Sequence, residues 1–206
     1  MWDIGGGTGG FAVRVAEAGH RVTVVDPNPD ALAALARRAD ERGVADRVVA
    51  IQGDIASLAD HAEAGSVDLV LCHQVLGLVD DHRAALGAIV RTLRPGGALS
   101  LLVGQRHAAV LARAMAGQFA QARAVLDGET GAEARFTSDE LEDLVAASGL
   151  SLVELHGIRV FADLVPSTLL DLEPGAVEGL LDLERAVASL PEYRTLAAQL
   201  HVIATC

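Results

Sequence analysis

The stretch "WDIGGGTGG", Trp2 to Gly10, decides the fold. A short strand-like run leads directly into five glycines within six residues, and a helix-like segment follows from Phe11. Glycines let a ligand approach the backbone more closely than any Cβ would allow. A turn of this kind, between a strand and a helix, places free N–H groups at the edge where open α/β sheets bind ligands. The stretch therefore predicts a cofactor-binding turn.

Two cofactor fingerprints fit this turn. Gly5, Gly7 and Gly10 satisfy G-x-G-x-x-G, the dinucleotide turn of dehydrogenases. Asp3, Gly5, Gly7 and Gly9 spell D-x-G-x-G-x-G, which resembles the first motif of class I methyltransferases that use S-adenosylmethionine. A tight strand-to-helix turn without a ligand is the third interpretation. The remainder of the chain has to decide between them.

Apolar runs alternate along the chain with segments of helical period, a pattern typical of βα units that build a parallel sheet. We expect strands at 2–4, 21–26, 48–54, 67–72, 93–103, 150–161 and 200–206. We expect helices at 11–18, 29–43, 81–93, 137–149 and 175–190, the fourth opened by a capping box at Thr137 and Glu140. The first strand is shorter than the usual five or six residues, so we expect that the N-terminus is truncated or that its start is assigned too late.

One domain, 1–206, accounts for the whole chain. Residues 1–103 form the expected cofactor-binding half. Residues 104–136 are helical in period but irregular, and we interpret them as a lid or a substrate-facing insertion. Residues 137–206 complete the fold as its C-terminal half.

Composition excludes several kinds of chemistry. All sixteen basic residues are arginine, so a Schiff-base lysine, a phosphate-loop lysine and a Tyr-x-x-x-Lys pair cannot be built. The net charge of −12 opposes an extended phosphate-tracking surface but permits a local arginine patch. Cys72 and Cys206 have no closely spaced ligand partners, so we expect no metal site. No leader or membrane-spanning run is evident, and we expect a cytoplasmic protein.

Acidic residues at strand ends favour methyl transfer over hydride transfer. Asp26 ends the second strand, where it would reach both ribose hydroxyls in either fingerprint, or would simply cap the next helix. Asp54 ends the third strand, where methyltransferases place an acidic residue beside the adenine amino group. Dehydrogenases need neither Asp54 nor Asp3. S-Adenosylmethionine is therefore the expected cofactor.

Further motifs carry a resemblance along nearly the full chain. They are "GGGTG", "VDLVLCHQVL", "LRPGGALSLL", "GIRVF" at 157–161, "LDLERA" at 181–186 and "LHVIA" at 200–204. The chain resembles class I methyltransferases and, among them, is similar to bacterial enzymes that methylate 5-carboxymethoxyuridine at the tRNA wobble position. The resemblance implies a doubly wound, Rossmann-like α/β fold with seven mostly parallel strands, the last antiparallel.

The resemblance also implies a set of site residues. Gly5 and Gly6 would line the methionine part of the cofactor, within a turn completed by Asp3, Gly7 and Gly9. The remaining roles are Asp26 at the ribose, Asp54 and Ile55 at the adenine, and His73 on the sulfonium side. A strand-end histidine bonded to backbone is the alternative for His73. The family usually carries an acidic residue where Gly77 stands.

The methyl acceptor is the least determined feature. A carboxylate acceptor is already ionised at neutral pH and needs no general base, but it does need a cation with fork geometry. Arg106 and Arg159 are the candidates, and either one could instead be a surface arginine. Three functions stay open: methylation of a tRNA carboxylate, methylation of a small molecule on O or N, and a non-catalytic partner subunit. The sequence leaves the oligomeric state open.

Overall fold

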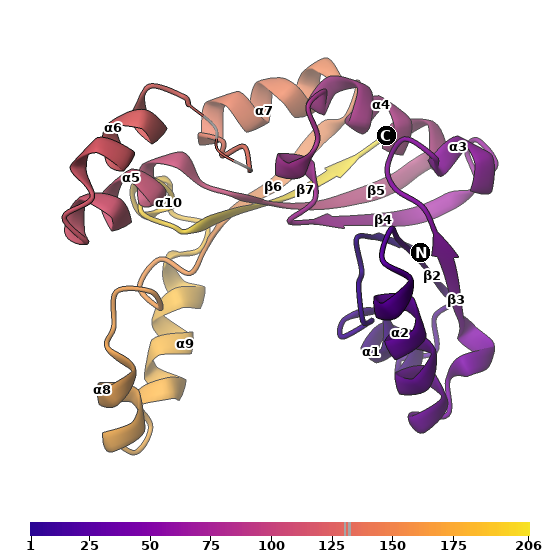
Figure 1. The fold of residues 1–206 in the computed structure, drawn as a ribbon, viewed down its shortest axis with the longest axis horizontal. Helices are drawn as coiled ribbons and strands as arrows, with labels where there is room; N and C mark the ends of the chain where they lie inside the picture. Colours follow the sequence, from indigo (N-terminus) through magenta and orange to yellow (C-terminus); the bar gives the residue numbers. More distant parts are fainter. Residues whose placement is uncertain (130, 132) are drawn as a thin grey trace.

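The structure is a computed structural model that describes residues 1–129, 131 and 133–206 (Figure 1). Its sheet has seven strands in the order β3-β2-β1-β4-β5-β7-β6. The first five strands in this order run parallel, while β7 is antiparallel to both of its neighbours, as the resemblance implied. The strands are β1 Trp2–Ile4, β2 Val22–Asp26, β3 Val48–Gln52, β4 Val67–His73, β5 Leu93–Gly104, β6 Ser151–Ile158 and β7 Gln199–Thr205. The short β1 lies at the centre.

Helices cover the two faces of the sheet. Figure 1 shows α1 and α2 on one face, α3, α4 and α7 on the other, and α8 and α9 projecting away beyond β6 and β7. The helices are α1 Ala12–Glu17, α2 Pro29–Glu41, α3 Leu58–His61, α4 His82–Thr92, α5 Arg106–Met115, α6 Phe119–Leu126, α7 Ser138–Ala147, α8 Ser167–Leu172, α9 Ala176–Val187 and α10 Pro191–Arg194, with 3-10 turns η1 Ala45–Arg47 and η2 Leu76–Leu78. The larger buried cluster includes Leu86, Ile89 and Leu141 against β4, β5 and β7.

Local signals placed two helix starts correctly. The Asn28 side chain accepts hydrogen bonds from the N–H groups of Asp30 and Ala31, directly before α2 and its first-turn proline. Thr137 and Glu140 form the expected capping box at the start of α7. In both cases the side chain satisfies N–H groups that a helix leaves without a partner.

The sixth strand ends earlier than the 150–161 expected, so that boundary was wrong. β6 stops at Ile158 because Arg159 adopts a left-handed backbone with φ of 60°. The Glu184 carboxylate then accepts hydrogen bonds from the N–H groups of residues 160, 161 and 162, at 2.9, 2.8 and 2.8 Å. Two motifs of the resemblance, "GIRVF" and "LDLERA", therefore meet, because the acid of the second holds the backbone of the first.

The segment from 104 to 136 returns to the sheet edge where it began. After α5 and α6, Phe136 forms a parallel bridge with Gln105, and Ala134 donates a hydrogen bond to the Gly77 carbonyl at 2.7 Å. Gln105 is fully buried: its amide nitrogen donates to the carbonyls of Arg194 and Thr195, and its amide oxygen accepts from the start of α5. The segment thus lies beside the carboxyl ends of β4 and β5.

Among the helices of the described residues, none is long and apolar enough to cross a membrane.

Candidate active site at the carboxyl edge of the sheet

The glycine turn, which follows β1, is tied by hydrogen bonds to the end of β2. The N–H of Gly5 donates to the Val25 carbonyl at 2.7 Å, and the N–H of Gly7 donates to Asp26 Oδ2 at 2.9 Å. Asp26 Oδ1 accepts from the Asn28 N–H at 2.9 Å, and the residue is only 8% exposed. Asp26 therefore braces the turn. It does not cap the next helix, because Asn28 does.

Packing explains why three of the glycines cannot carry a side chain. A Cβ on Gly5 would lie 2.3 Å from Val75, and a Cβ on Gly9 would lie 2.1 Å from Leu35. Both glycines also have positive φ. A Cβ on Gly6 would lie 2.6 Å from the Asp3 carboxylate. The same contact places Asp3 directly beneath the turn.

Gly7 faces open space instead. Its φ is +54°, and a Cβ added there would find Asp26 Oδ2 as its nearest neighbour, at 3.9 Å. The backbone of the turn is thus exposed at Gly7, next to a carboxylate that ends β2. A ligand with hydroxyl groups could approach both at once.

Asp3 is a buried carboxyl group with a perturbed affinity for protons. It is 4% exposed, and burial, followed by the negative charge of Asp26, raises its pKa to about 6. Near neutral pH two carboxylates therefore lie below and beside the glycine turn. This arrangement favours a cationic ligand at the edge of the sheet.

Asp54 and Ile55 follow β3 at the same edge. Asp54 Oδ1 accepts from the Ser57 N–H at 3.0 Å, which orders the turn, while the residue itself is exposed. Ile55 is buried at 3% exposure and packs into the larger core cluster. The pair therefore presents one acceptor group beside an apolar side chain.

His73, the last residue of β4, bonds a side chain and not the backbone. Its Nε2 lies 2.9 Å from Ser100 Oγ on β5, and that hydroxyl lies 2.8 Å from Nε2 of His201 on β7. This hydroxyl lies within hydrogen-bond distance of both rings and can donate to one while it accepts from the other. Burial, and then the neighbouring His201, lowers the pKa of His73. The ring is thus neutral at pH 7.

The two arginines expected at the acceptor are each paired with a carboxylate. Arg106 donates to Glu140 Oε1 at 2.7 Å and to the Arg135 carbonyl at 3.1 Å. Arg159 forms an ion pair with Asp163. Both lie on the β5–β6 side of the site, and each would have to share or exchange its partner to hold a second carboxylate.

Comparisons with known proteins agree with this geometry. Residues 2–101 match the family described as "Methyltransferase domain". The chain is 30% identical over 208 residues to the tRNA 5-carboxymethoxyuridine methyltransferase of Escherichia coli (strain K12), covering 98% of this chain and 78% of that protein. The chain belongs to the class I S-adenosylmethionine-dependent methyltransferases.

Two other relatives of this methyltransferase act on small molecules according to their names. The ubiquinone biosynthesis O-methyltransferase of Xanthomonas axonopodis pv. citri is 31% identical over 158 residues, covering 76% of this chain and 64% of that protein. The geranyl diphosphate C-methyltransferase of Streptomyces coelicolor A3(2), solved with S-adenosyl-L-homocysteine, has a TM-score of 0.66, with 19% identity over 99% of this chain and 71% of that chain. The structural likeness establishes the fold alone.

The residues of this methyltransferase fit its cofactor, S-adenosylmethionine. The cradle at Gly7 would be filled by a side chain, and Asp26 keeps acceptor capacity beyond its two backbone bonds. Asp3 and Asp26 suit a cofactor that carries a sulfonium and an ammonium group. Among residues 1–129, 131 and 133–206, no group of three His, Cys, Asp or Glu side chains could hold a metal ion.

Sequence reasoning missed two features of this methyltransferase that tertiary structure creates. Gln74, directly after His73, has φ of 59°, and its amide nitrogen is buried with no partner among the described residues. Left-handed backbone in a residue other than glycine is uncommon and is found most often at functional sites.

Gly77 has no room for the acidic residue usual in the family, because a Cβ would lie 2.6 Å from the Ala134 carbonyl oxygen.

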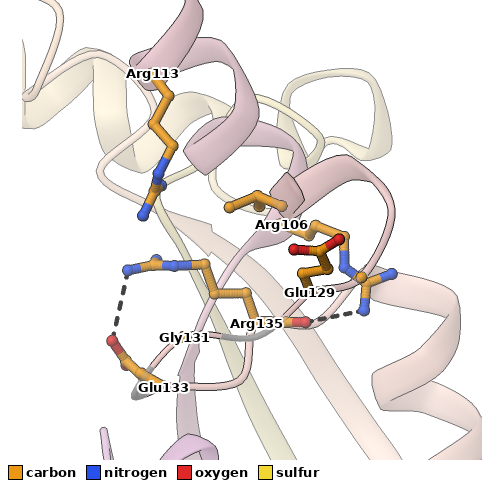
Figure 2. Close-up of a pocket in the computed structure, with 8 residues that line it drawn as sticks. Arg106, Arg113, Glu129, Gly131, Glu133 and Arg135 are labelled. Atoms are coloured by element: carbon orange, nitrogen blue, oxygen red, sulfur yellow. Dashed lines mark hydrogen bonds and ion pairs between the residues drawn. The ribbon is translucent and has the colours of Figure 1, made fainter. Parts of the chain in front are cut away.

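The second missed feature is a pair of arginines near Arg106. Arg113 and Arg135 line the same cavity as Arg106, between α5, α6 and the chain that follows α6 (Figure 2). The spacing of seven residues between Arg106 and Arg113 places them on one face of a helix, which was a readable signal. No sequence pattern indicated that Arg135 would lie near Arg113. Arg135 comes to the end of β5 through the bridge between Phe136 and Gln105.

Proposed function

We propose that this methyltransferase transfers a methyl group to the carboxylate of 5-carboxymethoxyuridine at the wobble position of tRNA. The observation that carries the proposal is the relative of that name in Escherichia coli, which is 30% identical along 98% of the chain. The arginines at the β5–β6 side of the site add support, because an anionic acceptor needs fixed cationic donors.

Each site residue has a proposed role toward the cofactor. The backbone of Gly5, Gly6, Gly7 and Gly9, above Asp3, would hold the methionine part. Asp26 would accept hydrogen bonds from the ribose hydroxyls, and Asp54 with Ile55 would bind the adenine. His73 would lie on the sulfonium side, where a neutral ring adds no positive charge to repel the cofactor. When bound, S-adenosylmethionine supplies an electrophilic methyl group.

The chain's own contribution to the chemistry is positioning. An ionised carboxylate needs no proton removed, which agrees with a site whose histidine is uncharged and bonded to Ser100. Displacement at a methyl group requires the attacking oxygen in line with the bond that breaks. Arg106 and Arg159 are proposed to hold the other carboxylate oxygen, so that one oxygen faces the methyl group.

A small-molecule O-methyltransferase is the second candidate. The ubiquinone biosynthesis O-methyltransferase, 31% identical over 158 residues, favours it. The net charge of −12 favours a small-molecule acceptor as well, because a negatively charged protein repels a polynucleotide, which is also an anion. A phenolic acceptor, unlike a carboxylate, would need a base to remove its proton.

The test uses methyl-labelled S-adenosylmethionine and two samples of the same tRNA. One sample carries 5-carboxymethoxyuridine at the wobble position, and the other carries unmodified uridine there. Label should enter the first sample only and should be released by mild alkali as expected for an ester. Label in neither sample, together with turnover of a catechol or phenol, would transfer the assignment to the small-molecule candidate.

Variants then test the arginines. Arg106→Lys and Arg159→Lys keep the charge but lose the bidentate geometry, so turnover should fall about tenfold or more. Arg123→Lys is the matched control, because Arg123 lies on α6 with a side chain 73% exposed and paired with Asp127. Full turnover in both test variants would remove Arg106 and Arg159 from the acceptor site.

A further inference from the structure

Two adjoining cavities beside α5 share Arg113 and Arg135. The smaller, of about 230 Å³, lies between α5, α6 and the described residues after α6. The larger, of about 500 Å³, lies between α5 and the chain after β6, and Arg159 lines it as well. The two arginines therefore stand at the junction of both cavities.

Glu129 and Glu133 line the smaller cavity with these arginines, but among the described residues neither glutamate forms an ion pair with Arg113. Among the described residues Arg113 has no ion-pair partner, and its guanidinium donates to the Ala109 carbonyl of its own helix at 3.3 Å. Arg135 has Glu133 at 3.5 Å, a long contact for an ion pair. Figure 2 shows the guanidinium groups of Arg113 and Arg135 directed toward one another. An oxyanion placed between them could accept hydrogen bonds from both guanidinium groups.

Arg135 is anchored, so this side of the junction is already ordered for binding. The Arg135 side chain packs on the end of β5, where a Cβ on Gly104 would lie 2.8 Å from its guanidinium. The Arg135 side chain is 30% exposed. The backbone carbonyl of Arg135 accepts a hydrogen bond from the Arg106 guanidinium. A guanidinium that is already ordered loses little freedom when it binds an oxyanion.

An anion held by Arg113 and Arg135 would lie beside the carboxylate that reacts. Arg106 lines the smaller cavity and Arg159 the larger, and these two arginines are proposed to hold the reacting carboxylate. None of the described residues that line the two cavities belongs to the glycine turn, to β2 or to β4, where the cofactor is expected. An acceptor that also reaches Arg113 and Arg135 therefore carries a second anionic group next to its carboxylate.

We infer that Arg113 and Arg135 form a phosphate subsite that binds the sugar–phosphate backbone of the acceptor. The inference rests on the proposed function, since the acceptor is taken to be RNA, in which every nucleotide adds one phosphate. The larger cavity adds an apolar wall from Leu111, Met115 and Leu164, suited to a sugar or base. A single subsite also agrees with the net charge of −12 of this protein.

The first experiment compares uridine 5′-monophosphate with uridine, titrated into the full chain saturated with S-adenosylhomocysteine. The wild type should bind the phosphorylated probe about tenfold or more tightly than uridine. Arg113→Gln and Arg135→Gln should remove most of this preference, while Arg123→Gln, with the same loss of charge on α6, should keep it. Glu133→Gln should strengthen the preference, because it removes the competing carboxylate.

The second experiment follows the binding of an anticodon stem-loop RNA against salt concentration. Each of the two test variants should reduce the slope of log affinity against log salt by about 0.7 to 0.9, the value for one phosphate contact. Affinity for S-adenosylhomocysteine should stay unchanged, which separates loss of the subsite from loss of the fold.

The outcomes separate this inference from the proposed function. Labelled tRNA with no phosphate preference and unchanged slopes would overturn the subsite and leave the function standing. A phosphate preference that depends on Arg113 and Arg135, without methylation of tRNA, would support the subsite and overturn the tRNA acceptor. Loss of the preference in Arg123→Gln as well would overturn the subsite, because general charge would then explain it.

Discussion

Replacing Asp3 with asparagine should stabilise the protein above pH 6 but not at pH 4. The carboxyl group lies beneath the glycine turn at 4% exposure, and burial and the charge of Asp26 raise its pKa to about 6 from an ordinary 3.8. The folded state therefore holds the proton more tightly than the unfolded state does. The stability that this proton confers is present below pH 3.8 and is lost as the pH rises through 6.

The size of the effect follows from the shift in pKa. A rise from 3.8 to about 6 is about 2 units, and each unit corresponds to about 1.4 kcal/mol, so ionisation of Asp3 costs about 3 kcal/mol. Asparagine never ionises and escapes this cost. Any constant penalty of the amide cancels when the variant is compared with the wild type at several pH values. The difference in unfolding free energy should therefore rise by about 3 kcal/mol between pH 4 and pH 7 and then level off.

Urea unfolding of both proteins at pH 4, 5, 6, 7 and 8 measures this difference. Asp68→Asn is the control, because its ion pair with Arg94 lowers the pKa of Asp68 below 3.8, so its titration lies largely below pH 4 and the difference should stay nearly flat across this range. A flat difference for Asp3→Asn across this range would refute the placement of a buried, ionisable carboxyl beneath the turn.

Three further predictions test other contacts. Gly9→Ala should lower the unfolding free energy by about 2–4 kcal/mol, since its φ is +74° and the new Cβ would meet Leu35 at 2.1 Å; wild-type stability in a denaturant melt would contradict this. Glu184→Ala should cost about 2–4 kcal/mol in the same melt, because three N–H groups lose a charged acceptor; a loss below about 0.5 kcal/mol would argue against that contact. Proton NMR should show His73 and His201 titrating below pH 6.5, so their contribution to stability is full above 6.5 and is lost on acidification; ordinary titration of both would contradict their burial.

Features encoded by neighbouring residues were predictable from the sequence. The glycine turn, the carboxylate that ends β2 and the caps at Asn28 and Thr137 each depend on residues within a few positions of one another. The seven-stranded sheet and the antiparallel β7 came with the resemblance, since periodicity alone fixes which segments are strands but not how they pair. These parts of the fold were confirmed.

Features that join distant parts of the chain were not predictable. Glu184 holds a backbone segment more than twenty residues earlier, and its identity as an acceptor depends on where α9 packs. The left-handed Gln74 follows from the turn between β4 and η2, for which its side chain gives no hint. The same limit applies to Arg135, which faces Arg113 only because Phe136 returns to the start of α5.

The buried amide of Gln105 has a mechanical consequence. Its nitrogen holds the carbonyls that follow α10, and its oxygen holds the first turn of α5, so one side chain joins the two elements without help from water. Tilting α5 away from the sheet would leave the amide nitrogen and oxygen of the fully buried Gln105 without hydrogen-bond partners. The free-energy cost of such unpaired buried groups opposes that tilt. α6, by contrast, is flanked by Gly117 and Gly128, both at positive φ. A bulky acceptor would therefore displace α6 at a lower cost than α5, which carries Arg113.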